Sequence, residues 1–195
     1  YIYINDVAGL LSLPQMGVLE IHPWGSNIKN IENPDIIVFD LDPAPEIKWK
    51  DIVKAAFEVK NKLQEFKLKS FVKTTGGKGL HVVIPINPEY TWDAVKVFAH
   101  TFVDYLVKIN PDKYTATMGK SKRSGKIFID YLRNQRGATA IAPYSTRARF
   151  NAPIATPIAW NELTNNIKDT TFTIKTILKR LQKLKHDPWK DFFKI

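Results

Sequence analysis

The stretch IIVFDLDP, residues 36–43, constrains the fold most, because a strongly strand-forming run ends there in two carboxylates. Side chains alternate between the two faces of a strand, so Asp40 and Asp42 point to the same face. Pro43 cannot continue a hydrogen-bonded ladder, which places the pair where the strand ends. Two like charges side by side need a counter-charge, and carboxylate oxygens are ligands that Mg²⁺ and Mn²⁺ prefer. The segment therefore predicts a strand that delivers a candidate metal site.

The same D-x-D pattern has two other interpretations. Two solvated acids often mark a strand end, and sugar-nucleotide transferases also carry the pattern, so it does not identify a reaction. A third acid, Asp130, lies in the strand-like segment KIFIDYL. It is either a salt-bridge partner of the bases around it or the third member of a carboxylate cage, which can hold two divalent ions.

The net charge of +10 is concentrated in one part of the chain. Between Lys113 and Arg149 there are nine basic residues and one acid. A solvated basic face is one interpretation, but so concentrated a field favours a surface that binds phosphates. The chain contains no cysteine, which excludes disulfides and cysteine-based zinc sites. No apolar run reaches membrane-spanning length and no signal peptide is visible, so we expect a cytoplasmic protein without a membrane partner.

Hydrophobic periodicity predicts one α+β domain over residues 1–195, with a mixed or antiparallel sheet flanked by helices. The expected strands cover residues 17–26 (running into a loop), 36–42, 70–75, 80–86, 126–132 and 138–143. The expected helices cover residues 49–66, 91–109 and 172–184, the last within a helical closing segment at 161–195. The chain begins at Tyr1 rather than Met, so we expect a fragment that lacks an N-terminal segment.

The loop KTTGGKGLHV, residues 73–82, is the second candidate site. Its glycines allow the backbone to approach an anion closely, and successive N–H groups can cradle a phosphate. Thr75 adds a hydroxyl and Lys78 adds a positive charge. The order of residues is not that of a Walker A loop, because a strand pattern follows it. A hairpin turn that needs glycine for positive φ angles is the alternative interpretation.

Two of the four histidines are candidates for the same site. His81 directly follows the glycine-rich turn, and His22 ends an expected strand beside Pro23 and Trp24. A packed structural role is the alternative for both. His100 and His186 lie in helical patterns and are expected to be structural or solvated.

Arginines supply the candidate contacts to a triphosphate. The motif YSTRAR places Arg147 and Arg149 two residues apart, so both guanidinium groups point the same way if the segment is extended. Such a pair can bind phosphate oxygens in a bidentate manner. Arg133 and Arg136 follow Asp130 closely and are expected within reach of the same anion.

Four segments, in order, resemble the polymerase/primase domain of bacterial ATP-dependent DNA ligase D. The segments are GVLEIHPWGS, VFDLDP, TTGGKGLHV and IFIDYLRNQRGATAIAPYSTRAR, and the resemblance covers residues 1–160. That domain belongs to the archaeo-eukaryotic primase superfamily and works in non-homologous end joining. The resemblance implies a primase-polymerase catalytic core with an RRM-like sheet. It also implies an N-terminal segment that binds the 5′-phosphate at a DNA gap, little of which precedes Tyr1.

The resemblance implies a role for each matching residue. Two Mn²⁺ or Mg²⁺ ions would be held by Asp40, Asp42 and Asp130, and His22 belongs to the active site. The incoming triphosphate would be contacted by Thr75, His81, Arg147 and Arg149, with Lys78 adding charge from the same loop. Thr75 stands where the family usually has Ser, and it keeps the hydroxyl. The residues expected to bind DNA are Lys120, Arg123, Arg133 and Arg136.

The function that we predict is DNA-directed nucleotidyl transfer, which adds NTPs or dNTPs to primer 3′ ends at breaks or gaps. The expected partners are DNA ends or gapped DNA, ligase and nuclease domains of the same protein, and the bacterial Ku end-binding protein. A metal-dependent nuclease using the same carboxylates is one alternative. A non-catalytic platform that binds DNA ends is the other.

Overall fold

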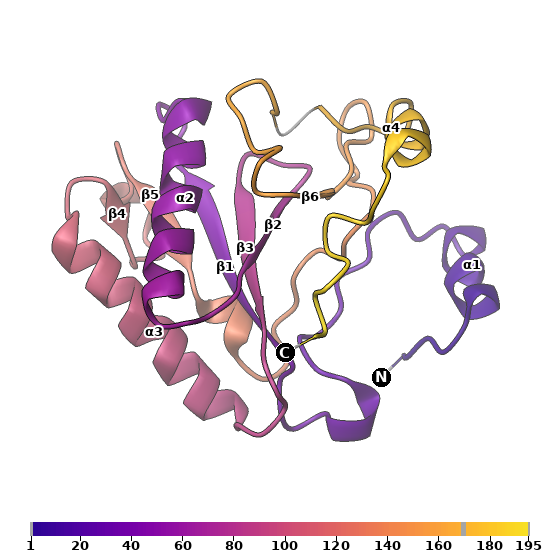
Figure 1. Ribbon diagram of the computed structural model, residues 1–195, viewed down its shortest axis with the longest axis horizontal. Coiled ribbons are helices and arrows are strands. Elements are labelled where there is room, and N and C mark those ends of the chain that lie inside the picture. Colours follow the sequence, from indigo (N-terminus) through magenta and orange to yellow (C-terminus); the bar gives the residue numbers. More distant parts are fainter. Residues whose placement is uncertain (1, 169–170, 195) are drawn as a thin grey trace.

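A six-stranded mixed sheet organises the chain, whose computed structural model describes residues 2–168 and 171–194 (Figure 1). The strands are β1 (Ile36–Pro43), β2 (Phe71–Thr74), β3 (Leu80–Pro85), β4 (Tyr114–Thr115), β5 (Ile127–Asp130) and β6 (Pro157–Ile158). Their order is β4-β5-β1-β3-β2-β6, and neighbours are antiparallel except for the parallel β4–β5 pair. This arrangement confirms the expected α+β class with a mixed sheet.

Two long amphipathic helices, α2 (Trp49–Glu65) and α3 (Trp92–Ile109), bury their apolar sides in one core with the sheet. Thr91 caps α3 as expected, because its hydroxyl accepts a hydrogen bond from the Ala94 N–H. Figure 1 shows this helix pair on the left of the view, and α1 (Val7–Gln15) and α4 (Ile177–Lys183) on the right. No helix in the described part of the chain is long and apolar enough to cross a membrane.

The two faces of the sheet differ because side chains alternate along each strand. Phe39 and Leu41 of β1 are fully buried in the core that contains α2 and α3. Val38, one residue before Phe39, belongs instead to a small second cluster, which Trp189 and Phe192 from the C-terminal segment help to form. The polar residues of that second face lie toward the end of β1, and they form the candidate site.

Two of the expected strands do not form. Residues 17–26 and 138–143 are not assigned to the sheet. They pair irregularly with each other: the Ala142 N–H donates to the Ile21 carbonyl at 2.9 Å, and the Ala140 N–H donates to the Pro23 carbonyl at 3.3 Å. The Ile141 carbonyl also accepts a hydrogen bond from Lys73 Nζ of β2 at 2.6 Å, so a side chain and not a backbone ladder joins the second segment to the sheet.

The expected closing helix is also shorter than predicted. The α4 helix covers Ile177–Lys183, whereas the pattern predicted residues 172–184. The reason is local, because Phe172 is buried and its carbonyl accepts a hydrogen bond from the Ile154 N–H at 2.8 Å. Thr173 forms a β-bridge with Pro153, which holds this part of the segment extended.

A buried amide side chain extends the hydrogen bonding of β1 past the last β5 residue. The β1–β5 ladder begins at Asp40, which leaves Val38 without a backbone partner on that side. Asn134 fills the position: its side-chain oxygen accepts from the Val38 N–H at 2.7 Å, and its amide donates to the Val38 carbonyl at 2.8 Å. The side chain therefore takes the place of a neighbouring strand.

Asn134→Leu is expected to destabilise the fold by about 2–4 kcal/mol, because it leaves two buried backbone groups unpaired. Chemical unfolding in urea would measure the change. Asn165→Leu, at an exposed position, is the matched control and should change stability by less than about 0.5 kcal/mol. Equal stability of the two variants would show that the Asn134 amide is not needed to complete β1.

Candidate active site

Four side chains form one row across the sheet. The strand register places Lys73 of β2 opposite His81 of β3, His81 opposite Asp40 of β1, and Asp40 opposite Asp130 of β5. Asp42 lies two residues after Asp40 on the same face. The row brings together the acids of the segments IIVFDLDP and KIFIDYL and the glycine-rich hairpin, as the sequence predicted. It also contains Lys73, to which the sequence analysis assigned no role.

The three carboxylates differ in burial: Asp130 is buried, Asp40 is partly buried, and the Asp42 side chain is half exposed. Burial and then the neighbouring charge of Asp40 raise the pKa of Asp42. Burial raises the pKa of Asp130 as well, even though its side chain accepts a hydrogen bond from the Leu132 N–H at 2.8 Å. Asp40 behaves differently: burial opposes ionisation, but the charges of His81, Arg133 and Lys73 lower its pKa. Asp40 is therefore the carboxylate that is held most firmly in its charged form.

Two arginines neutralise these acids. Arg133 lies 3.2 Å from Asp130 and 3.7 Å from Asp40, and Arg123 lies 3.2 Å from Asp42. Within residues 2–168 and 171–194, no three acidic, histidine or cysteine side chains meet closely enough to form a ready-made metal site. The donor chemistry still fits a divalent cation, because carboxylate oxygens share one face and two positive groups already balance them.

His81 and Lys73 are almost completely buried beneath this site. The His81 Nε2 atom lies 3.5 Å from Asp40, and its Nδ1 atom has no hydrogen-bond partner among the described residues. Lys73 donates a hydrogen bond from Nζ to the Ile141 carbonyl at 2.6 Å. Burial lowers the pKa of Lys73 to about 7 and also lowers the pKa of His81. Strands 71–74 and 80–85 form a hairpin around the turn at residues 75–79, and the pairing register of that hairpin places Lys73 opposite His81. This local pairing is the sequence signal that could have identified Lys73 as a site residue.

The glycine-rich loop is both a hairpin turn and the rim of the site. The Thr75 hydroxyl donates to the Gly79 carbonyl and accepts from the Gly77 N–H, both at 3.1 Å. Gly76 has a φ of +63°, which favours glycine. A Cβ atom on Gly79 would collide with the Leu41 carbonyl oxygen. Close contact between the hairpin and β1 therefore requires this glycine, and it brings the loop next to the carboxylates.

The paired arginines reach the site from an irregular segment rather than from the extended strand that we expected. The Arg149 N–H donates to the Arg147 carbonyl at 2.8 Å, so the chain turns between them. The Arg147 guanidinium donates to the Thr75 carbonyl at 3.1 Å, and it forms an ion pair with Glu20 at 3.1 Å. Both arginines line one cavity of about 210 Å³ with His22, Asp40, Asp42, Thr75, Lys78, His81 and Arg133.

Glu20 connects the N-terminal segment to this cavity and was not predicted as a site residue. Its carboxylate bonds to the His22 Nε2 atom at 2.7 Å and accepts from the Ala148 N–H at 2.8 Å. Burial would raise its pKa, but these bonds and Arg147 outweigh burial and lower the pKa to about 2. Glu20 therefore positions both His22 and Arg147.

Glu20→Gln is expected to lower the melting temperature at pH 7 by about 2–4 °C, which corresponds to about 1 kcal/mol after allowance for solvent screening. The pKa of Glu20 is lower in the folded state than its ordinary value of 4.5, so its stabilisation is present above pH 4.5. That stabilisation is lost as the pH falls toward 2. Thermal unfolding between pH 7 and pH 3 should show the two proteins converging as acid is added. A constant difference across this range, or the same loss in Glu89→Gln on an exposed loop, would contradict the assignment.

Three of the four residues expected to bind DNA form ion pairs with acidic side chains. Arg123 and Arg133 contact the carboxylates. Arg136 instead forms a bidentate pair with Glu32, at 2.8 and 2.6 Å. The side chain of Lys120 lies outside the described part of the structure.

Comparisons with known proteins agree with this arrangement. The model of the LigD primase-polymerase domain matches residues 1–189. The Pseudomonas aeruginosa multifunctional non-homologous end joining protein LigD is 38% identical over 190 residues, which are 97% of this chain and 23% of that protein. The Bacillus subtilis bifunctional LigD is 33% identical over 195 residues, which are all of this chain and 32% of that protein.

A solved structure is similar over nearly the whole chain. The polymerase domain of Mycobacterium tuberculosis ligase D, in complex with DNA, has a TM-score of 0.88 and 28% identity. The match covers 98% of this chain and 69% of that one. The chain spans about a quarter to a third of the curated relatives described above. By sequence and by fold, this chain belongs to the LigD primase-polymerase domain family.

Proposed function

We propose that this domain is a DNA-directed nucleotidyltransferase that extends primer 3′ ends at breaks or gaps in DNA. The primer 3′-hydroxyl attacks the α-phosphate of an incoming NTP or dNTP, a new phosphodiester bond forms, and pyrophosphate leaves. The observation that carries the proposal is the row across the sheet, in which Asp40 and Asp130 face each other beside a phosphate-sized cavity lined by basic groups. That combination suits a polyanionic substrate held close to carboxylates.

Asp40, Asp42 and Asp130 are the residues that would hold two divalent ions, Mn²⁺ or Mg²⁺. Bound there, the ions would activate the attacking oxygen and stabilise charge on the phosphates. The guanidinium groups of Arg123 and Arg133 form ion pairs with the same carboxylates. When metal ions bind, these arginines must therefore either move away or contact the carboxylates together with the ions.

The remaining residues bind and orient the nucleotide. Arg147, Arg149 and Lys78 supply positive charge, while backbone N–H groups of the glycine-rich loop are available to phosphate oxygens. His81 has an unpartnered, buried Nδ1 atom, and Glu20 and Thr75 hold Arg147 in place. Such a site acts mostly by positioning and charge stabilisation. In the full-length protein we propose a role in ligase D-type end joining, with Ku and with attached ligase and nuclease domains as partners.

Extension of a labelled primer on gapped DNA, with each NTP and dNTP and with Mn²⁺, Mg²⁺ or EDTA, tests the proposal. Metal-dependent addition of one or a few nucleotides is the expected result, and it would reveal the sugar preference. Shortening of the DNA without added nucleotide would indicate a nuclease. Binding of DNA with no turnover under any condition would indicate a non-catalytic platform.

A further inference from the structure

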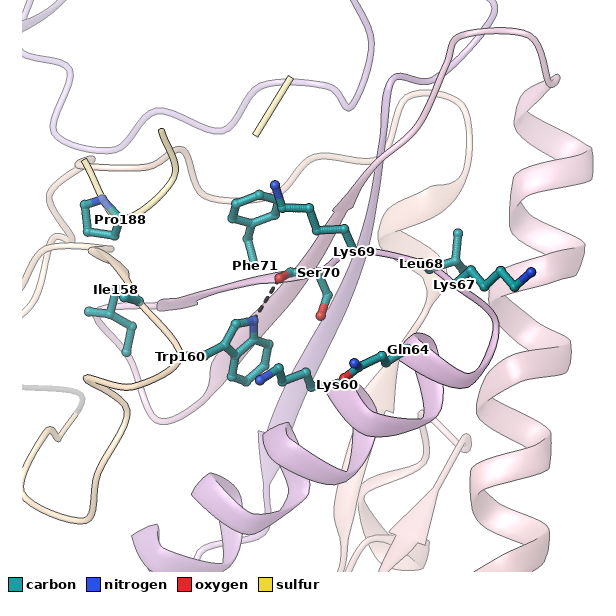
Figure 2. Close-up of a pocket in the computed structure, with 11 residues that line it drawn as sticks. Lys60, Gln64, Lys67, Leu68, Lys69, Ser70, Phe71, Ile158, Trp160 and Pro188 are labelled. Atoms are coloured by element: carbon teal, nitrogen blue, oxygen red, sulfur yellow. Dashed lines mark hydrogen bonds between the residues drawn. The ribbon is translucent and has the colours of Figure 1, made fainter. Parts of the chain in front are cut away.

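A second cavity, outside the candidate active site, lies where α2 ends and β2 begins (Figure 2). Its volume is about 500 Å³, which is within the range of pockets that bind small ligands. Its aromatic and aliphatic walls come from Phe71 of β2, Ile158 of the neighbouring edge strand β6, and Trp160. None of the residues that line it belongs to the carboxylate site.

The cavity is positively charged. Lys60, Lys67 and Lys69 line it, and none of the described residues that line it is acidic. None of the three lysines forms an ion pair with a described residue within 4 Å. The Lys60 ammonium lies 5.2 Å from the Trp160 ring centre, and the Lys69 ammonium lies 5.3 Å from the Phe71 ring centre. Positive groups therefore stand directly beside aromatic rings.

Two features hold this arrangement in place. The Trp160 indole N–H donates to the Ser70 carbonyl at 2.8 Å, which fixes the ring against the start of β2, as the dashed line in Figure 2 shows. Lys67 follows the end of α2 with a φ of +60°. Its N–H donates to the Gln64 carbonyl at 2.9 Å and the Leu68 N–H donates to the Leu63 carbonyl at 3.0 Å, so a helix-terminating turn fixes the backbone from which the Lys67 side chain extends.

From this geometry we infer that the cavity is an accessory subsite for single-stranded DNA. The inference rests on the proposed function, which makes DNA the substrate. A nucleotide offers a flat aromatic base and a negative phosphate in one repeating unit, and the cavity offers aromatic rings and unpaired lysines. An acidic peptide would satisfy the lysines but would not need an aromatic wall.

The position of the cavity suits a strand that leaves the active site. Phe71 and Thr74 are the first and last residues of β2, and Thr75 follows in the glycine-rich loop. Four strand residues span about 13 Å. Single-stranded DNA is bound elsewhere over about 4–16 nucleotides per domain, so one strand can reach both sites.

The test measures binding of DNA in EDTA without nucleotide, so that it does not depend on catalysis. Primer-templates with a 2-nucleotide or a 12-nucleotide single-stranded template overhang are labelled, and binding is followed by fluorescence anisotropy. The triple variant Lys60→Gln/Lys67→Gln/Lys69→Gln should bind the long overhang about tenfold more weakly and the short one normally. For the long overhang, the slope of the logarithm of the binding constant against the logarithm of the salt concentration should also become about two units shallower, since three phosphate contacts are lost.

The matched control is Lys54→Gln/Lys96→Gln/Lys108→Gln, which removes the same charge from α2 and α3 outside the cavity. It should retain the preference for the long overhang. Trp160→Phe and Trp160→Leu both lose the bond to Ser70, but only Phe keeps an aromatic ring, so only Leu should weaken binding of the long overhang.

Equal binding of both overhangs by the wild-type domain and the lysine variant would overturn the inference. Loss of binding to a poly-glutamate peptide, with DNA binding unchanged, would overturn it in favour of an acidic peptide. The proposed function is judged separately by extension on the 2-nucleotide overhang with metal, which the lysine variant should perform at the wild-type rate.

Discussion

Asp40→Asn is expected to reduce primer extension by about a thousandfold or more while leaving the fold intact. Asp40 lies at the centre of the row, opposite both His81 and Asp130, and positive groups keep it ionised. Asparagine keeps the size of the side chain but removes the charge that would bind a divalent ion. The rate of extension on gapped DNA, in Mn²⁺ and in Mg²⁺, measures the effect.

The control is Asp104→Asn on the exposed side of α3, where the carboxylate pairs with His100 at 3.3 Å. That variant should extend primers at the wild-type rate. Circular dichroism and thermal unfolding should show that both variants fold. Near-normal extension by folded Asp40→Asn would rule out the metal assignment at this residue.

Arg147→Ala is expected to have the second large effect. It should lower kcat/KM for the nucleotide about a hundredfold, mostly by raising KM. The guanidinium group bridges the Thr75 carbonyl and Glu20, so its loss would remove the proposed phosphate contact and loosen the loop. Arg147→Lys should recover little, because an ammonium group cannot reproduce the planar, multi-donor geometry. Steady-state kinetics at saturating DNA measure the change.

Two readouts separate nucleotide binding from general damage. The affinity for gapped DNA without nucleotide should change by less than threefold in Arg147→Ala. Glu20→Gln removes the ion-pair partner but keeps the guanidinium, so its kcat/KM should remain within about tenfold of the wild-type value. Similar losses in both variants would mean that Arg147 acts through the loop structure and not through the nucleotide.

Strong local patterns predicted the central strands and the two long helices well, but not α1, β4 or β6. The alternation in IIVFDLDP predicted that Asp40 and Asp42 share one face, and the structure confirms this, with Phe39 and Leu41 buried in the core on the other face. The apolar periodicity of α2 and α3 likewise predicted their boundaries to within one residue. Such patterns arise because one side of a helix or strand is buried, so apolar residues recur along the sequence with the period of that element.

Segments whose conformation depends on distant partners were predicted poorly. Residues 17–26 and 138–143 have strand-like composition, but they pair irregularly with each other and not with the sheet. Arg147 and Arg149 would share a direction if their segment were extended, yet a turn separates them.

The sequence by itself determined the central strand, the glycine-rich turn and the identity of the acids, because local alternation and chain stiffness place those side chains. Only the tertiary structure decided that His81 lies opposite Asp40, that Glu20 supports Arg147, and that Asn134 completes the bonding of β1. Each of these contacts joins residues that lie far apart in the sequence and meet only when the sheet has formed. A pairing of that kind depends on strand register and loop path, which no single segment of sequence encodes.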